Sequence, residues 1–482
     1  MDAVRSQFIG GELVSGSSTD AIDVVDPATG NVIAEVNAGS SADVDTAVAA
    51  ARHAFDTGEW QARSAEDRAS VLWRMAEGIG EHLEELANLE VRDNGMPLLL
   101  ARAMMGSAIS KLKYHAGMVG KIHGLTADLS GPGQELLAYT RAEPVGVAAT
   151  ITPWNAPFAT FIAKLAPALA AGCSVVSKPA EQTPLTAMRF GELLYDWDLL
   201  PKGQVNIVNG LGTVAGDALA KHPDVDKISF TGSTAVGRKL IEASAGNLKR
   251  LTLELGGKSP LFIFDDADLE QAIPAAAQAI FLNSGQVCIA GSRLFIQRGV
   301  YDQVVEGVAR IGEALRLGNG LDPMTQLGPL VSEQHLLRVM GYIESGRSEG
   351  AELVGGGARH GDEGYFVTPT VFANRGRSDL RIVREEIFGP VVVAMPFDGI
   401  EEVAALANDT DYGLGAGVYT RDNSTAHRVA KVIKAGNIWV NCYGVLNPAV
   451  PFGGYKRSGW GRESGSEGLQ SYLETKAVYV RL

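Results

Sequence analysis

Short apolar runs alternate with segments of helical periodicity between residues 145 and 257. Each run has the length of a buried strand, and each segment between two runs has the residue spacing of a helix. The expected strands cover 145–152, 174–178, 205–208 and 227–230, and the expected helices cover 157–171, 184–195 and 213–221. Such alternation predicts a parallel sheet with helices on its faces, and therefore an α/β fold.

Three further regions complete the expected organisation. Residues 41–90 have helical patterns, and a second αβ block is expected from about residue 260 to 440. The elements expected early in that block are strands at 261–264 and 294–297 and a helix at 301–315. Two β-leaning segments stand apart, 136–141 after a Gly131-Pro132-Gly133 turn and the tail 474–482. Isolated strands expose unpaired edges, so these segments predict a small sheet that forms an oligomer.

Charge and cysteine usage limit the partners and the compartment. The chain carries 42 basic and 56 acidic residues, a net charge of −14, with no basic run, so no nucleic-acid partner is expected. Residues 145–163 lack charge, but their two prolines and one asparagine argue against a membrane-spanning helix. Residues 1–10 show no secretory pattern. The three cysteines form no CxxC pair and the histidines lack metal-ligand spacing, which predicts a cytoplasmic protein without a metal.

Several polar residues follow predicted strands, where open α/β sheets bind ligands. Gly232 and Ser233 open a helix, an arrangement that suits a phosphate cradle or a simple Ser N-cap. Lys178 and Glu181 could hold ribose hydroxyls or could form a solvated ion pair. The glycines after the strand 205–208 do not match the dinucleotide fingerprint G-x-G-x-x-G; they are Gly210, Gly212 and Gly216.

Cys288 and Glu254 are the candidate nucleophile and base. Cys288 has apolar neighbours, which suits a buried structural cysteine as well as a thiol nucleophile. A nucleophile also needs a base and an oxyanion donor, because only the thiolate attacks. Glu254 lies between two leucines, so burial would raise its pKa toward that of a general base. A paired structural glutamate would give the same pattern, and both interpretations stay open.

Seven motifs in order resemble those of the NAD(P)-dependent aldehyde dehydrogenase superfamily, hydrolytic type, over nearly the whole chain. They are Ile151-Thr-Pro-Trp-Asn155, Lys178-Pro-Ala-Glu181, Phe230-Thr-Gly-Ser233, Leu253-Glu-Leu-Gly-Gly257, Gly285-Gln-Val-Cys288, Glu385-Glu-Ile-Phe-Gly-Pro390 and Pro451-Phe-Gly-Gly-Tyr-Lys456. The resemblance implies a Rossmann-like coenzyme domain at 1–121 and 145–256 and an α/β catalytic domain at 257–468. A small β arm at 122–144 and 469–482 would build a homodimer or homotetramer.

The resemblance also implies roles in oxidising an aldehyde to its acid with NAD, with NADP less favoured. Cys288 would attack the aldehyde carbon, Asn155 would donate to the oxyanion, and Glu254 would activate the water that hydrolyses the thioester. Lys164 and Glu463 match positions that relay the proton. The expected coenzyme contacts are Ile151, Trp154, Lys178, Glu181, Gly212, Gly216, Phe230, Gly232, Ser233, Leu255, Glu386 and Phe388.

The segment after Asn155 predicts the kind of aldehyde. Small residues share one helix face there, and the family places that face on the aldehyde tunnel. They are Ala156, Ala159, Thr160 and Ala163. The rest of the tunnel wall, called the wall below, is expected to consist of Val287, Ile289, Leu446 and Phe452. The wall predicts a bulky neutral aldehyde, aromatic or terpenoid. Alternatively, the small residues only allow tight helix packing, and the enzyme is a broad-range or semialdehyde dehydrogenase.

Three other functions remain at this stage: a non-catalytic relative on the same fold, a CoA-acylating relative, and a cysteine hydrolase without redox chemistry. The joint presence of Cys288, Glu254 and Asn155 argues against the first. Glu254 argues for water, and so against transfer to CoA. A histidine base for Cys288 would support the third, and no histidine lies near Cys288 in the sequence.

Overall fold

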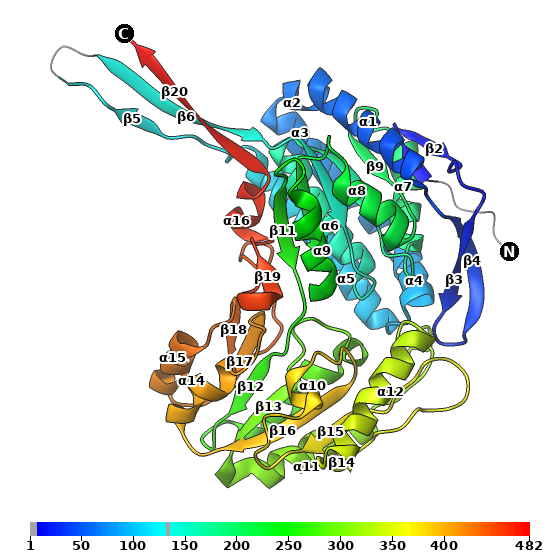
Figure 1. The fold of residues 1–482 in the computed structure, drawn as a ribbon, viewed down its shortest axis with the longest axis vertical. Helices are drawn as coiled ribbons and strands as arrows, with labels where there is room; N and C mark the ends of the chain where they lie inside the picture. The colour runs from blue at the N-terminus through cyan, green and yellow to red at the C-terminus, as the bar shows by residue number, and fades with distance from the viewer. Residues whose placement is uncertain (1–6, 132–134) are drawn as a thin grey trace.

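The computed structural model describes residues 7–131 and 135–482. The opening residues 1–6 and the Pro132-Gly133 part of the predicted turn lie outside the described residues. Within the described ranges, two large sheets form the two halves of the molecule, and a narrow arm projects from one of them (Figure 1). No helix in this part of the chain is long and apolar enough to cross a membrane.

The first large sheet has the order β19-β11-β10-β7-β8-β9-β1-β2 among the described strands. Its parallel centre consists of β7 (Val147–Ile151), β8 (Ser174–Lys178), β9 (Val205–Ile207), β10 (Lys227–Thr231) and β11 (Arg250–Glu254). Its edges are β1 (Gln7–Ile9), β2 (Glu12–Val14) and β19 (Gly459–Trp460). The strand order reverses between β7 and β10, and ligands bind in open sheets at such a switch point.

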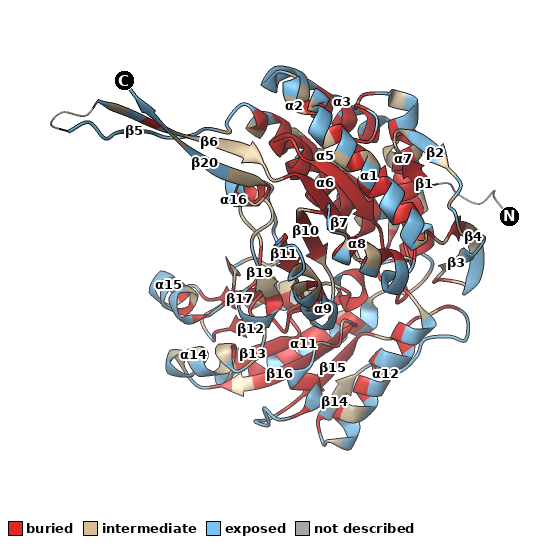
Figure 2. Cartoon of the chain, turned by 45° about the horizontal axis from the view of Figure 1, so that its top comes forward, coloured by how far each residue is buried: buried red, intermediate tan, exposed pale blue. Residues whose placement is uncertain are grey.

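Helices cover both faces of this sheet because alternate strand residues are apolar on both sides. Figure 2 shows the buried strands of this sheet between helices. Ala148 packs into the core under α6, whereas Val147 and Ala149 pack under α1. One face carries α1 (Ser41–Thr57), α8 (Asp217–Lys221) and α9 (Thr234–Ser244). The other carries α3 (Ala65–Glu81), α4 (Leu83–Asn94), α5 (Leu98–Val119), α6 (Pro157–Ala171) and α7 (Leu185–Trp197), with the short α2 (Glu59–Ala62) beside α1.

The second large sheet has the order β14-β15-β16-β13-β12-β17-β18, and only β14 is antiparallel among the described strands. Its strands are β12 (Pro260–Ile263), β13 (Arg293–Gln297), β14 (Glu352–Gly355), β15 (Thr370–Ala373), β16 (Val391–Phe397), β17 (Gly415–Tyr419) and β18 (Asn437–Val440). One core lies under α10 (Leu269–Phe281) and α11 (Tyr301–Ala314). The other lies under α12 (Glu333–Ser348), α13 (Arg381–Arg384), α14 (Ile400–Asn408) and α15 (Asn423–Val432).

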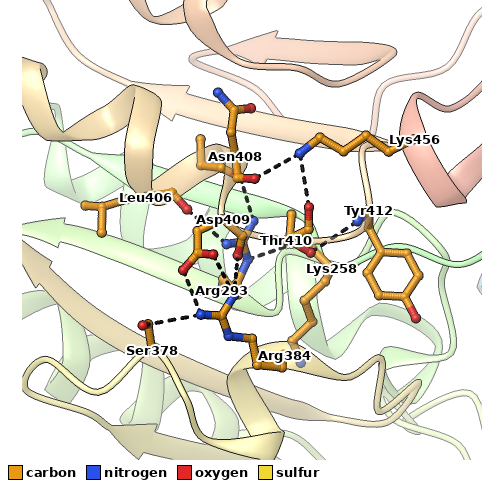
Figure 3. Close-up of polar contacts among 11 residues, drawn as sticks. Lys258, Arg293, Ser378, Arg384, Leu406, Asn408, Asp409, Thr410, Tyr412 and Lys456 are labelled. Carbon is orange, nitrogen blue, oxygen red and sulfur yellow. Dashed lines mark hydrogen bonds and ion pairs between the residues drawn. The ribbon is translucent and has the colours of Figure 1, made fainter.

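A buried arginine donates hydrogen bonds to backbone carbonyl oxygens at the amino edge of the second sheet (Figure 3). Arg293 opens β13, and its guanidinium donates to the carbonyl oxygens of Lys258, Leu406 and Ala407 at 2.9, 3.0 and 2.9 Å. The last carbonyls of a helix lack helical donors, so cations are favourable there. Arg293 thereby fixes the end of α14 against the turn that leads into β12.

The predicted isolated strands form the arm. β20 (Leu473–Arg481) pairs along its whole length with β6 (Leu136–Pro144), and β5 (Thr126–Asp128) forms the other edge. Most of its residues are exposed or half-buried (Figure 2). The short helix α16 (Gly465–Gln470) leads into β20. A separate hairpin of β3 (Ala21–Asp26) and β4 (Asn31–Asn37) lies near the N-terminus, where no strand was expected.

Candidate active site

The two sheets bring the motifs together from opposite directions. Asn155, Lys178, Ser233 and Glu254 lie at or just beyond the carboxyl ends of β7, β8, β10 and β11. Cys288 precedes β13 of the second sheet. The candidate site therefore lies between the carboxyl edge of the first sheet and the amino edge of the second.

Motif glycines allow these loops to approach one another closely. A Cβ atom added at Gly256 would collide with the carboxylate of Glu386, and one at Gly257 would collide with the carbonyl oxygen of Cys288. A Cβ at Gly285 would collide with the backbone of Gly389. The segments carrying Glu254, Cys288 and Glu386 consequently pack backbone against backbone, an approach that only glycine permits.

The loop before Cys288 has an unusual backbone. Asn283 and Ser284 have φ values of 50° and 55°, and Gly285 follows at 71°. Such left-handed residues are strained unless their surroundings hold them, and they cluster at functional sites. The Ser284 hydroxyl donates to the carbonyl oxygen of Gly328 at 2.6 Å, and the Asn283 amide donates to that of Asn155 at 2.9 Å. These bonds hold the loop that presents Cys288.

Asn155 is joined to the same loop by a second bond. Its side-chain amide donates to the carbonyl oxygen of Gln286 at 2.8 Å. An asparagine amide has two N–H donors, so this bond fixes the amide and leaves one donor for a ligand. Asn155 and Cys288, predicted to act together, thus come from different sheets but share one hydrogen-bonded loop.

Cys288 is half-buried in a small apolar cluster that includes Val287, Ile289 and Phe452. The other residues of this cluster were not expected from the sequence; they are Leu414, Trp439, Cys442 and Tyr443. Burial raises the pKa of the Cys288 thiol to about 12, and the charges of Glu386 and Glu254 add to this effect. The cysteine is therefore a thiol in the free protein. Leu446, expected in the wall, lies outside this cluster and is 61% exposed.

Glu254 is 2% exposed, and neither carboxylate oxygen has a hydrogen-bond partner among the described residues. Burial raises its pKa well above the ordinary value, and the charge of Glu463 raises it further. Lys164 and Arg462 oppose this effect. A carboxyl group with a raised pKa and free oxygens has the properties of a general base, so the structural alternative of a paired glutamate does not hold here.

Lys164 and Glu463 form an ion pair beside Glu254, as their predicted joint role requires. Lys164 is 0% exposed and also donates to the Ser229 hydroxyl at 3.2 Å. Two further lysines, Lys111 and Lys227, lie near Glu463. Burial lowers the pKa values of both lysines, and the charge of Glu463 opposes this effect. No motif marked either of them, because their nearness to Glu463 arises only from tertiary packing.

Four of the residues predicted to bind adenosine lie close together. The Lys178 ammonium pairs with Glu181 at 3.3 Å, but Lys178 is buried rather than solvated. Gly212 and Gly216 flank a π-helical turn, and a Cβ at either position would approach only Glu181 or Lys178. The Ser233 hydroxyl accepts from the Val236 N–H at 3.3 Å, so it is an N-cap in this structure. Apolar side chains are nevertheless exposed beside these polar groups; they are Leu211, Val214 and Val236.

The predicted nicotinamide residues also meet. Glu386 accepts from the Gly257 N–H at 2.8 Å, and burial raises its pKa to about 7. Phe388 has a φ of 62° and packs edge-on against Trp154, with ring centroids 5.2 Å apart. This polar and aromatic set fits a nicotinamide riboside. The remaining expected contacts Ile151, Phe230 and Leu255 pack in or against the apolar core of the first sheet.

The small-residue face of α6 points away from the main core. Ala156 and Thr160 are half-buried, and Ala159 and Ala163 are 3% and 8% exposed. The opposite face supplies Phe158, Phe161, Ile162 and Leu165 to the core. A side chain from another helix also reaches this face: the Lys111 ammonium of α5 lies 3.0 Å from the carbonyl oxygen of Ala159.

Comparison with known proteins agrees with the geometry. The family model for the aldehyde dehydrogenase family matches residues 13–478. Aldehyde dehydrogenase 1 of Tanacetum cinerariifolium is 46% identical over 98% of this chain and 94% of its own length. An aldehyde dehydrogenase of Enchytraeus buchholzi is 47% identical over 98% of this chain and 95% of its own. The NAD+ complex structure of aldehyde dehydrogenase from Bacillus cereus has a TM-score of 0.97 at 46% identity, covering 100% of this chain and 97% of that one.

Fold and site together define an oxidoreductase with a cysteine loop facing a Rossmann-like sheet. The chain belongs to the aldehyde dehydrogenase family. The resemblance, the fold class and the enzyme class expected from the sequence are confirmed. The roles of individual residues stay predictions.

Proposed function

We propose that this chain oxidises a bulky, largely apolar aldehyde to its carboxylic acid with NAD through a thioester on Cys288. The observation that carries the proposal is the convergence of Cys288, Asn155 and Glu254 from two sheets, joined by the Asn155–Gln286 hydrogen bond of 2.8 Å. In this proposal the coenzyme domain covers 1–121 and 145–256, and the catalytic domain covers 257–468. The cytoplasm is the proposed compartment.

The first half of the mechanism belongs to Cys288 and Asn155. The Cys288 thiol releases its proton to water, its sulfur bonds to the aldehyde carbon, and the carbonyl oxygen becomes an oxyanion. The free N–H of Asn155 and the backbone N–H of Cys288 donate to that oxygen; a preorganised donor of this kind contributes about 3–4 kcal/mol. Lys178, Glu181, Glu386 and Phe388 would hold NAD, which when bound accepts the hydride from the aldehyde carbon.

The second half belongs to Glu254. Its unpaired carboxylate takes a proton from water, and the resulting hydroxide attacks the thioester carbon. The carbon–sulfur bond breaks, the acid leaves, and the cysteine is regenerated. The Lys164–Glu463 pair adjoins Glu254 and carries the proton away. Burial raises the pKa of Glu254, which makes its carboxylate a stronger base than an exposed glutamate.

The test is NADH absorbance with an aldehyde and NAD in the absence of CoA. Steady turnover supports the proposal, whereas turnover only with CoA identifies an acylating enzyme. Silence over a broad panel of aldehydes would leave a non-catalytic relative or a hydrolase. A histidine-dependent hydrolase finds no support in the described residues, because none of their hydrogen bonds joins a histidine to Cys288.

NAD is expected to give a higher kcat/KM than NADP. Glu181 accepts from a ribose 2′-hydroxyl and repels a 2′-phosphate, and the paired Lys178 reduces but does not cancel that repulsion. Glu181→Ala should shrink the NAD/NADP ratio of kcat/KM by about tenfold, because it removes a like-charge contact. Glu242→Ala, an exposed glutamate on α9, should leave the ratio unchanged. A wild-type preference for NADP would contradict this assignment.

The aldehyde is expected to be bulky, and Ala163→Trp tests the wall. A tryptophan on the small-residue face of α6 should lower kcat/KM for phenylacetaldehyde and citral by about tenfold or more, because it overfills their space. Acetaldehyde in the same variant is the internal control and should change little. The wild-type panel should also include hexanal and succinic semialdehyde. Acetaldehyde or the semialdehyde as best substrate would show that the wall is misassigned.

The arm is expected to form a homodimer or homotetramer. Apolar residues are exposed along it, including Leu125, Tyr479 and Leu482, and its strand edges lack partners within the described residues. Light scattering should give a mass of at least two chains, and Tyr479→Asp should shift it toward one. Val32→Asp, at another exposed apolar position, is the matched control. A stable, active wild-type monomer would rule out this role for the arm.

A further inference from the structure

Lys111 is a buried cation that the mechanism above does not use. It comes from α5, and its ammonium donates to the carbonyl oxygen of Ala159 at 3.0 Å. Among the described residues it forms no ion pair. An ammonium has three N–H donors, and this one uses a single neutral acceptor. Two of the three donors therefore have no acceptor among the described residues.

The surroundings of Lys111 do not supply the missing negative charge. Glu463 is close enough to raise its pKa, but Glu463 is already paired with Lys164, which lowers the pKa of Lys111. The His115 ring donates from Nδ1 to the Lys111 carbonyl oxygen, and burial keeps this histidine neutral by lowering its pKa to about 4. Burial and the charge of Glu463 raise the pKa of Glu254, which disfavours its charged form. Three lysines, Lys111, Lys164 and Lys227, thus lie near the single acidic side chain of Glu463.

Lys111 also lies on the face proposed to bind the aldehyde. Burial lowers its pKa to about 8, yet the residue keeps accessible surface, as Cys288 does. Lys111 is therefore half-buried and is not sealed inside the core. Its contact, Ala159, belongs to the small-residue face of α6, where alanines leave room for a long side chain.

Lys111 and the oxyanion donor Asn155 contact the same short stretch of chain. Asn155 directly precedes Ala156, the N-cap residue of α6, and the Lys111 ammonium donates to the carbonyl oxygen of Ala159 in the first turn of that helix. An aryl aldehyde held at Asn155 and Cys288 would extend along this first turn.

We propose that Lys111 is a specificity-determining residue that binds an anionic oxygen, carboxylate or phenolate, on the far end of an aryl aldehyde. The ring packs on the small residues of α6, and the ammonium pairs with the oxygen that would otherwise lose its hydration. The inference rests on the proposed function and refines its aldehyde from neutral to oxyanion-bearing. Lys111 takes no part in the bond changes at Cys288.

The first experiment uses the wild-type enzyme with two matched rings, 4-formylbenzoate and 4-methylbenzaldehyde. At pH 7 the carboxylate should have the higher kcat/KM, mainly through a lower KM. The ratio should fall about tenfold between pH 7 and pH 9, because the ammonium loses its proton near pH 8. 4-Hydroxybenzaldehyde, measured at about pH 8 where its phenol is largely ionised, separates the two oxygen types: a kcat/KM above that of 4-methylbenzaldehyde shows that a phenolate also binds, and an equal kcat/KM shows that only the carboxylate does.

The second experiment removes the charge and keeps the length. Lys111→Met should lower the carboxylate-to-methyl ratio of kcat/KM by about tenfold or more, the effect of losing a charged hydrogen bond, and should make it independent of pH. Its kcat for 4-methylbenzaldehyde should change less than about twofold. Lys113→Met is the matched control, because Lys113 lies two residues away and packs over the Trp73 ring at 4.9 Å.

The two proposals fail in different ways. If neither aldehyde is oxidised by the wild-type enzyme, the proposed function fails. If both are oxidised but the ratio is insensitive to pH and to Lys111→Met, the assignment of Lys111 is overturned and the function stands. If Lys111→Met does not fold, Lys111→Gln and the wild-type pH series decide the question alone.

Discussion

Cys288→Ser is expected to lower kcat by at least about 10⁴-fold, because a serine without a dedicated base is a much poorer nucleophile than a thiolate. The environment strengthens this expectation. The apolar cluster and the two nearby carboxylates hold the pKa of Cys288 at about 12, and the same surroundings would disfavour an alkoxide even more strongly. Steady-state NADH production measures the loss.

The fold and coenzyme binding should survive this substitution, since serine has nearly the same size and shape as cysteine and the position is only half-buried. Circular dichroism and quenching of tryptophan fluorescence by NAD check both. Cys442→Ser is the matched control, because Cys442 packs in the same cluster and should retain activity. If Cys288→Ser kept about a tenth of kcat or more, Cys288 would not be the nucleophile.

Glu254→Gln should leave a burst of NADH but slow the following turnover by about 10²–10⁴-fold. The amide keeps the shape of the side chain in its enclosed position but cannot take a proton from water. The thioester therefore accumulates after a single hydride transfer. Stopped-flow absorbance should show a burst near one NADH per active site, followed by a slow phase.

Two comparisons make the Glu254 result specific. Glu306→Gln, on the exposed side of α11, should behave like the wild-type enzyme. An activated small thiol added as an alternative acceptor should restore turnover of Glu254→Gln, because a thiol can cleave the thioester without a protein base. Disappearance of the burst itself would assign Glu254 an earlier step than deacylation.

Local signals explain which elements could be predicted from the sequence. The expected helix 157–171 and strand 174–178 match α6 and β8 to the residue. Pro157 at the first turn and Gly172, with φ of 102° at the C-cap, mark the ends of that helix chemically. The expected helix 213–221 is shorter than predicted, because a π-helical turn between Gly212 and Gly216 precedes α8.

Contacts between residues distant in sequence explain which strands and site residues were not predicted. β1 joins the first sheet by pairing Phe8 with Ile207, and β19 joins it from the far end of the chain by pairing with β11. Short strands of this kind have little periodicity of their own, and their partners fix them. The same applies to the site. Trp439, Tyr443 and Lys111 reach it only through tertiary packing, whereas the motif residues follow strands that the sequence already marks.

The reciprocal bonds between Asn155 and the Cys288 loop have a consequence for how the enzyme loses activity. The nucleophile and its oxyanion donor rest on separate hydrophobic cores. Two hydrogen bonds between Asn155 and the Cys288 loop align them. Locally weak regions open at lower free energy than whole cores. Gentle heating or low urea should therefore inactivate the enzyme reversibly while its helices remain intact, so that catalytic decay precedes melting.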